Sequence, residues 1–199
     1  RDLRMSRGLG DVYKRQVSML TFVGCSSKTT MKETDAFRFD SKTGYAYSTA
    51  PFGIDTTELE SAIGSKLAMV SESPATAPFA YTNYSSENIV QSADCSCKFD
   101  AQFDENGKLF SVAFHEQLAR GMAEEHFEAA SKRFTETFGA PAVQDDNGTG
   151  TQYLEWQDKS SGTALGLTYS DLGTTDPTLM ISVFCLLYTS DAADDLIGV

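Results

Sequence analysis

The 199-residue chain has the length of one domain or two small ones, and a hydrophobic fraction of 41% with 11% aromatic residues is enough to build a core. Its formal net charge of −12 disfavours nucleic acid and anionic membrane surfaces as partners, because the chain offers no basic stripe that could release counterions from phosphates. No apolar run reaches the ~18–20 residues that a complete transmembrane helix needs. Composition therefore indicates a folded acidic protein and leaves its fold open.

The two ends of the chain differ in kind from its middle. Asp11–Gln16 can be encoded by GAT GTG TAT AAG AGA CAG, and Cys185–Ser190 by TGT CTC TTA TAC ACA TCT, whose core is the reverse complement of the first string. Inverted copies around an insert resemble the adapters that a fragmenting transposase leaves in a sequencing library. We therefore expect residues 1–16 and 185–199 to be adapter-derived and the native sequence to be cut at both ends.

Residues 17–24 and the cysteine that follows resemble the lipobox of bacterial lipoproteins. The stretch is largely apolar and ends in the small Gly24, next comes Cys25, and a polar segment continues from there; Phe22 stands where the family usually has Leu. The resemblance implies a truncated signal peptide over 17–24 and a lipid attached to Cys25. The alternative is a short buried strand in which this cysteine is only a small apolar residue.

A lipidated cysteine would also set the location of the protein. Residues 25–35 would form a tether, and the lipid would hold the chain at the outer face of the cell membrane or in the periplasm. Membrane lipid would then be a partner through Cys25.

A folded domain is expected over residues 36–184, and its first elements are a hairpin and a short helix. Phe37–Phe39 and Tyr45–Tyr47 alternate around a turn, which predicts two strands. Asp55 has the chemistry of a helix N-cap, with Glu58 at the third helical position, and Gly64 is a stop signal.

The middle of the chain predicts strands. A loop or edge segment is expected over 71–80, with strands near 79–84 and 89–91. A clearer hairpin follows over 95–103 and 108–115. In its first strand one set of alternating residues would share a face: Cys95, Cys97, Phe99, Ala101 and Phe103.

The last part of the domain predicts a helix and three strands. Phe127, Ala130, Phe134 and Phe138 recur at helical spacing, so a helix is expected over 122–138, ended by Gly139 and Pro141. A loop over 145–150 and three antiparallel strands complete the chain, at 153–157, 163–169 and 179–184. Tyr153, Leu154 and Trp156 alternate along the first of these, so one face of it should enter the core.

The expected fold class is α+β, with an antiparallel sheet and two helices packed on one of its faces. An alternative arrangement is two helix-plus-sheet units, since a helix closed by glycine and followed by strands occurs twice. This element order is similar in outline to outer-membrane assembly lipoproteins and β-lactamase-inhibitor-like proteins. That resemblance covers element order alone and implies no binding residue.

Cys95 and Cys97 are the one cysteine pair left when Cys25 is a lipid anchor and Cys185 is adapter. In a straight strand, residues two apart point the same way, but their α-carbons lie near the upper limit for a disulfide. The open alternatives are buried or unpaired thiols, a strained disulfide, and a redox or metal role.

No motif points to catalysis, a cofactor or a metal. His115 and His126 have no partner at metal-ligand spacing and are expected to be solvated surface residues. The segment 145–148 faintly suggests a calcium loop and is more typical of a turn. We expect no catalytic residue, no cofactor and no metal ligand.

Three functions stay open. The leading one is a membrane-tethered, non-catalytic binding or assembly module, and the second is an extracellular inhibitor or sensor domain that captures a protein or peptide along an exposed sheet face. The third is an enzyme that uses carboxylates or Cys95 and Cys97. A deep pocket of converging polar groups would favour the enzyme, and a flat aromatic sheet face would favour binding.

Overall fold

The computed structural model describes residues 31–33, 36–47, 50–74, 77, 79–91, 96–117, 122–146, 148–173 and 176–186. Cys25, Cys95 and the side chain of Cys97 lie outside this description, as do residues 1–30 and 187–199. The predictions of lipidation, of adapter-derived ends and of a thiol pair therefore stay predictions.

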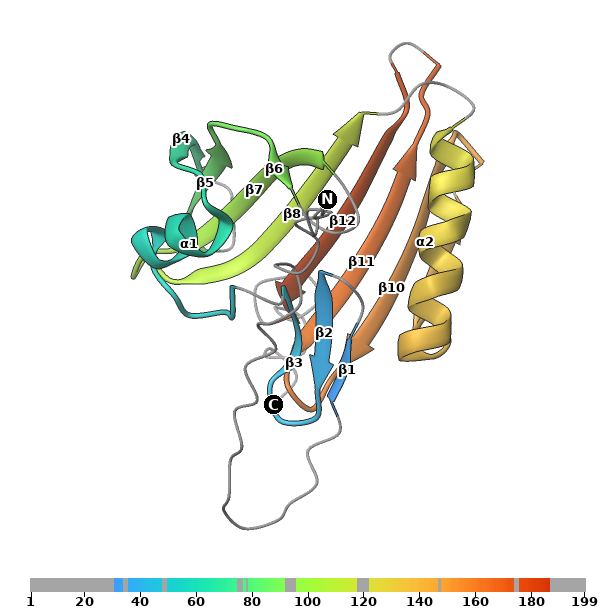
Figure 1. Cartoon of the computed structure of the whole chain (residues 1–199), viewed down its shortest axis with the longest axis horizontal. Helices are drawn as coiled ribbons and strands as arrows, with labels where there is room; N and C mark the ends of the chain where they lie inside the picture. The colour runs from blue at the N-terminus through green and yellow to red at the C-terminus, as the bar shows by residue number, and fades with distance from the viewer. Residues whose placement is uncertain are drawn as a thin grey trace, which may run out of the picture.

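A large antiparallel sheet dominates the described part of the chain (Figure 1). Its strands lie in the order β4-β5-β7-β8-β12-β11-β10-β9, and β6 pairs with β7. The strand bounds are β4 Leu67–Glu72, β5 Tyr81–Ser86, β6 Val90–Gln91, β7 Ser96–Asp104, β8 Leu109–Gln117, β9 Val143–Asp146, β10 Thr151–Asp158, β11 Thr163–Ser170 and β12 Thr178–Cys185.

The remaining elements are a small sheet and two helices. The small sheet has the order β1-β2-β3, with β1 Met31–Glu33, β2 Phe37–Asp40 and β3 Gly44–Tyr47. The helices are α1 Thr56–Ile63 and α2 Ala123–Phe138. Both α2 and β3 lie against β11 and β12 (Figure 1). The expected α+β class is confirmed.

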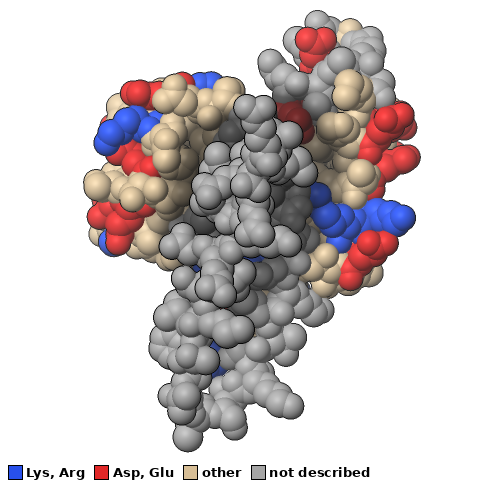
Figure 2. Space-filling view, viewed as in Figure 1, with Lys and Arg blue, Asp and Glu red and all other residues tan. Residues whose placement is uncertain are grey.

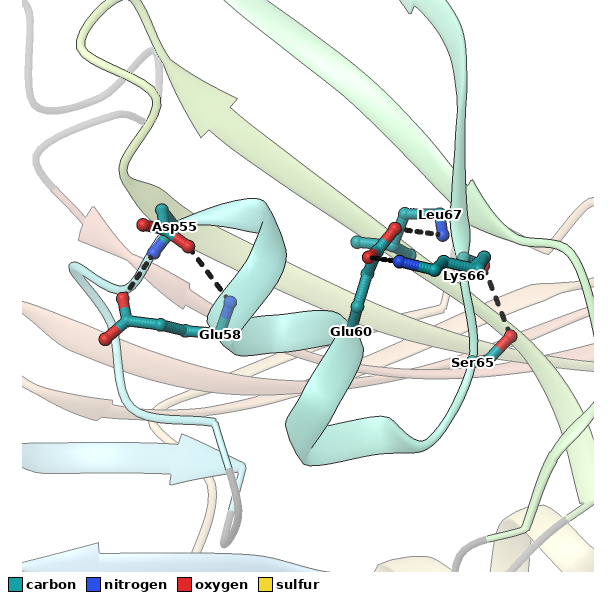
Figure 3. A network of polar contacts seen from close by, with 6 residues as sticks. All are labelled: Asp55, Glu58, Glu60, Ser65, Lys66 and Leu67. Carbon is teal, nitrogen blue, oxygen red and sulfur yellow. Dashed lines mark hydrogen bonds and ion pairs between the residues drawn. The ribbon is translucent and has the colours of Figure 1, made fainter.

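Helix α1 begins and ends where its sequence predicts. The Glu58 backbone N–H donates to Asp55 Oδ1 at 2.9 Å, and the Asp55 N–H donates to Glu58 Oε2 at 2.9 Å, which completes a capping box. Gly64 ends the helix in the left-handed region, with φ 67°. Glu60 then accepts hydrogen bonds from Lys66 Nζ and from the Leu67 N–H, so α1 is joined to the start of β4 (Figure 3).

The predicted apolar stripe of α2 is buried. Phe127, Ala130 and Phe134 are buried, while Phe138 packs at the edge of the same cluster. The ring of Phe134 meets Trp156 of β10 edge-on, with the ring centroids 5.6 Å apart. Aromatic edge-to-face pairs of this kind add to the free energy gained from burial alone.

Phe37 of β2 joins the layers of the core. Its ring lies 5.6 Å from that of Phe114 on β8 and 5.8 Å from that of Phe134 on α2, both in edge-to-face geometry. The small sheet, the large sheet and α2 therefore share one hydrophobic cluster, to which α1 contributes Leu59.

The structure differs from the sequence-based expectations at several strands. β4 has no predicted counterpart, because five of its six residues are exposed and show no alternation. The loop expected over 145–150 is wrong at its start, since Val143–Asp146 pair with β10 as an acidic edge strand. Pairing to a neighbouring strand satisfies backbone groups without needing an apolar pattern.

Two described strands extend across the boundaries predicted from the sequence, and those boundaries stay predictions. Met31–Glu33 fall within the expected tether, yet they pair with β2 as β1. Cys185 falls within the expected adapter segment, yet it ends β12 opposite Thr163, and the Leu186 N–H donates to the Gly162 carbonyl at 2.7 Å. Burial raises the pKa of the Cys185 thiol from 9.0 to about 11.

The outer surface of α2 is strongly charged. Figure 2 shows acidic and basic side chains together on the side of the molecule where α2 lies. Glu124 and Glu125, in the first turn of the helix, are exposed, as the sequence predicts. Within the described residues, neither helix has the length and hydropathy needed to cross a membrane.

Candidate functional site

The large sheet has two unlike faces. On β8, Val112 and Phe114 are 0% and 1% exposed and belong to the core, whereas Ser111, Ala113 and His115 alternate with them. Side chains of a strand point to opposite faces in turn, so the second set lies on the face away from the core. We call this second face the open face.

A groove of about 560 Å³ runs along the open face. Residues of β4, β5, β7, β8 and β12 line it, so it crosses the middle of the sheet and reaches the β4 edge. Its apolar lining includes Val70, Met180 and Phe184. Its polar lining is made of Ser71, Asn83, Ser85, Asp100, Gln102, Ser111, His115 and Ser182.

An imidazole–carboxylate pair lies in the groove. His115 Nε2 of β8 is 3.2 Å from Asp100 Oδ2 of β7, and both side chains are about two-fifths exposed, at 41% and 42%. The sheet register places Lys98 opposite His115 and Asp100 opposite Ala113, so the pair is formed by diagonal neighbours. Such pairs lie within reach of long side chains across adjacent strands.

A chain of amide hydrogen bonds crosses the groove beside this pair. Gln102 Nε2 of β7 donates to Asn83 Oδ1 of β5 at 2.9 Å, and Asn83 Nδ2 donates to Ser71 Oγ of β4 at 2.9 Å. Both NH₂ groups point along the chain toward β4. The carbonyl oxygen of Gln102 is left at the other end as an acceptor.

Beyond the groove, the same face carries a closed polar cluster on β10. The Tyr153 hydroxyl donates to Glu155 Oε2, and Gln157 Nε2 donates to Glu155 Oε1 at 2.6 Å. Glu155 is only 8% exposed, and each of its carboxylate oxygens accepts a hydrogen bond within the cluster. Burial, together with the hydrogen bond to Glu155 and its charge, raises the pKa of Tyr153 well above 10.0.

Gly166 of β11 makes room for that cluster. A Cβ atom there would lie 2.8 Å from Ser182 Oγ and 3.3 Å from the Tyr153 ring. Ser182 lines the groove and pairs with Gly166 in register. The absence of a side chain on Gly166 therefore lets the Tyr153 ring lie on the sheet next to the groove.

Both histidines are surface residues, as the sequence predicts, but each has a partner that was not predicted. Each histidine is partly exposed, and each faces a carboxylate: His126 Nδ1 of α2 lies 3.8 Å from Glu116 Oε2 of β8, as His115 lies near Asp100. Sequence reasoning missed both pairs because the partners come from other elements. The only signal was the alternation that places Asp100 and His115 on one face.

Other predicted features have mixed outcomes. Trp156 is 1% exposed, so the prediction that one face of its strand enters the core is confirmed. In the weak calcium-loop segment, Asp145 and Asp146 lie in β9, and the Gly148 N–H donates to Asp146 Oδ1 at 3.0 Å. Among the described residues, no group of three or more His, Cys, Asp and Glu side chains could hold a metal ion.

No protein-family model matches the chain, and no significant match is found among curated proteins or solved structures. The open face therefore has to be interpreted from its own chemistry.

The groove fits neither of the two expected site types. It is not a flat aromatic face, because polar side chains such as Asn83, Asp100 and Gln102 accompany the apolar ones in its lining. Neither histidine has a hydroxyl or thiol partner within the described residues. What the groove offers is a set of hydrogen-bonding groups on a rigid sheet, which is suited to holding a polar ligand or a partner's side chains.

Proposed function

We propose that the protein is a membrane-tethered extracytoplasmic lipoprotein that acts as a non-catalytic binding or assembly module, with its partner held on the open face. The single observation that carries the binding part is the groove across β4, β5, β7, β8 and β12. The opposite face is covered by α2 and the small sheet, which pack on the core. The open face is therefore the one whose hydrogen-bonding groups can reach a partner.

The tether part of the proposal rests on Cys25 and the lipobox-like residues before it. In a bacterial host, Cys25→Ser should abolish incorporation of a labelled fatty acid, because the thiol is the attachment point. Cys185→Ser is the matched control and should label like the unaltered chain. Labelling that survives Cys25→Ser would contradict lipidation at this residue.

The architectural part is that α1 and α2 pack on the same face of the large sheet, with two helix-plus-sheet units as the alternative arrangement. In support of two units, α1 precedes β4–β8 and α2 precedes β9–β12, and the two sets of strands meet at β8 and β12. In support of a shared face, Leu59 of α1 and Phe127 of α2 lie in one hydrophobic cluster.

A second candidate is a domain that captures an extended peptide, as an inhibitor or a sensor. The observation that favours it is the β4 edge, where Met69 and Val70 are 60% and 64% exposed and Val70 also lines the groove. An extended chain can add to such an edge through backbone hydrogen bonds.

Site-specific photo-crosslinking tests the binding part in living cells. A photo-reactive residue in place of Met180, in the groove, should give a discrete crosslinked product, and the same residue in place of Lys132, exposed on α2, should not. The same product from both positions, or none from position 180, would contradict binding on the open face.

A further inference from the structure

Two neighbouring residues on the open face of β7, Asp100 and Gln102, each keep an unused hydrogen-bond acceptor in the groove. Asp100 uses Oδ2 for His115, and its other carboxylate oxygen has no hydrogen-bond partner within the described part of the chain. Gln102 uses its NH₂ group on Asn83, so its carbonyl oxygen remains an acceptor. A ligand that supplies several donors would complement these two neighbouring residues of β7.

The groove also has no lysine or arginine in its lining. The nearest cation on this face of β7 is Lys98, which is not among the lining residues. Its ammonium group donates to the Ser86 and Glu87 carbonyl oxygens, at 2.9 and 3.1 Å. Asp100 is therefore the charged group that a ligand would meet first, beside the imidazole of His115.

Apolar side chains lie alongside these acceptors. Met180 and Phe184 of β12 line the groove together with Asp100 and Gln102. Lysine and arginine carry an aliphatic stem below a charged head, so they need apolar contacts and acceptors at once. An aromatic ring near the head group adds a cation–π contact.

We propose that the groove recognises a basic side chain, arginine or lysine, presented by a protein partner. This rests on the proposed binding function and names the chemistry of its partner. Asp100 and the Gln102 carbonyl receive the charged head, and Met180 and Phe184 contact the stem. The net charge of −12 favours the approach of a basic partner from a distance.

An NMR titration of the full ¹⁵N-labelled chain tests this recognition. The probes are a blocked glycine–serine peptide with one central arginine and the same peptide with citrulline, which has nearly the same shape but no charge. The arginine peptide should shift the amide signals of Asp100, Gln102 and Ser182 and bind about tenfold more tightly than the citrulline peptide, since its hydrogen bonds are charge-assisted.

Two substitutions that each remove one negative charge show where on the protein the arginine peptide binds. Asp100→Asn should weaken binding of the arginine peptide about tenfold, whereas Glu124→Gln on the exposed surface of α2 should leave it nearly unchanged, because an isolated exposed charge contributes little. An equal loss in both variants would show a non-specific field effect and overturn the inference.

The peptide comparison needs no variant, so a misfolded Asp100→Asn chain would not leave the inference untested. Equal binding of the arginine and citrulline peptides overturns it, while the open face would still stand as a binding surface. The absence of shifts with either peptide also overturns it. The crosslinking at position 180 then decides the proposed function separately.

Discussion

Trp156 donates its indole N–H to the carbonyl oxygen of Gly139 at 2.7 Å, which joins β10 to the end of α2. Gly139 ends that helix with φ 97°, and Trp156 is 1% exposed. The same side chain therefore fills the core beside Phe134 and satisfies a carbonyl group at the helix terminus.

Trp156→Phe should lower the free energy of unfolding by about 2 kcal/mol, because the smaller ring leaves a gap and cannot donate to Gly139. Urea unfolding followed by circular dichroism measures the change. Leu172→Ala is the control: Leu172 is 62% exposed, and its truncation should cost less than about 0.5 kcal/mol. Equal stabilities of the two variants would show that Trp156 does not hold α2.

Asp55→Ala should lower the free energy of unfolding by about 1 kcal/mol, since the Glu58 N–H loses its acceptor and the capping box opens. Glu58→Gln is a matched control, because glutamine can still accept from the Asp55 N–H. Chemical denaturation of both variants decides the point. The capping role would fail if the glutamine variant were as destabilised as the alanine variant.

Gly44→Ala should cost about 2–4 kcal/mol, because φ is 73° there and the new Cβ would clash with the side chains of Ser161 and Thr163. Thr163 also accepts a hydrogen bond from the Tyr45 N–H at 2.8 Å, which ties the small sheet to β11.

Gly53→Ala separates backbone strain from the clash. Gly53 has φ 88°, and a Cβ added there would meet no atom within 4 Å. The loss in free energy of unfolding should therefore stay near the ~1 kcal/mol that a left-handed backbone conformation costs an alanine. Thermal unfolding of the two variants makes the comparison. A Gly44 variant no less stable than the Gly53 variant would argue against the close packing of β3 on β11.

Alkaline pH should destabilise the fold through Tyr45. Burial, and then the negative charge of Asp158, raises the pKa of Tyr45 from 10.0 to about 12. The folded state therefore favours the neutral phenol, and its contribution is complete below pH 10 and is lost as the pH rises to 12. The loss should be of the order of 2 kcal/mol.

Tyr45→Phe isolates that contribution, since phenylalanine cannot ionise. The fall in stability between pH 10 and 12 should be shallower in the variant than in the unaltered chain, as measured by urea unfolding at each pH. The difference between the two chains also removes the background from the Cys185 thiol, whose pKa is raised in the same direction. Parallel pH profiles would rule out Tyr45 as the titrating group.

Expectations based on short segments agree best with the structure. The capping box at Asp55, the stop at Gly64 and the buried stripe of α2 all depend on residues within a few positions of each other. The strand expected over 108–115 is β8, with Val112 and Phe114 buried as their alternation predicts. β4 was missed because its residues are exposed and do not alternate.

The sequence by itself determined the bounds of α1, the end of α2 and which side of β7, β8 and β10 enters the core, because hydrogen-bond caps, stop residues and side-chain alternation are local properties. The tertiary structure alone decided that β8 pairs with β12 on its other side. That pairing sets Asp100 and His115, which the predicted hairpin already brings together, beside Met180 from a distant part of the chain. Pairing between distant strands depends on how the whole core closes, so no local pattern could have predicted the groove on the open face.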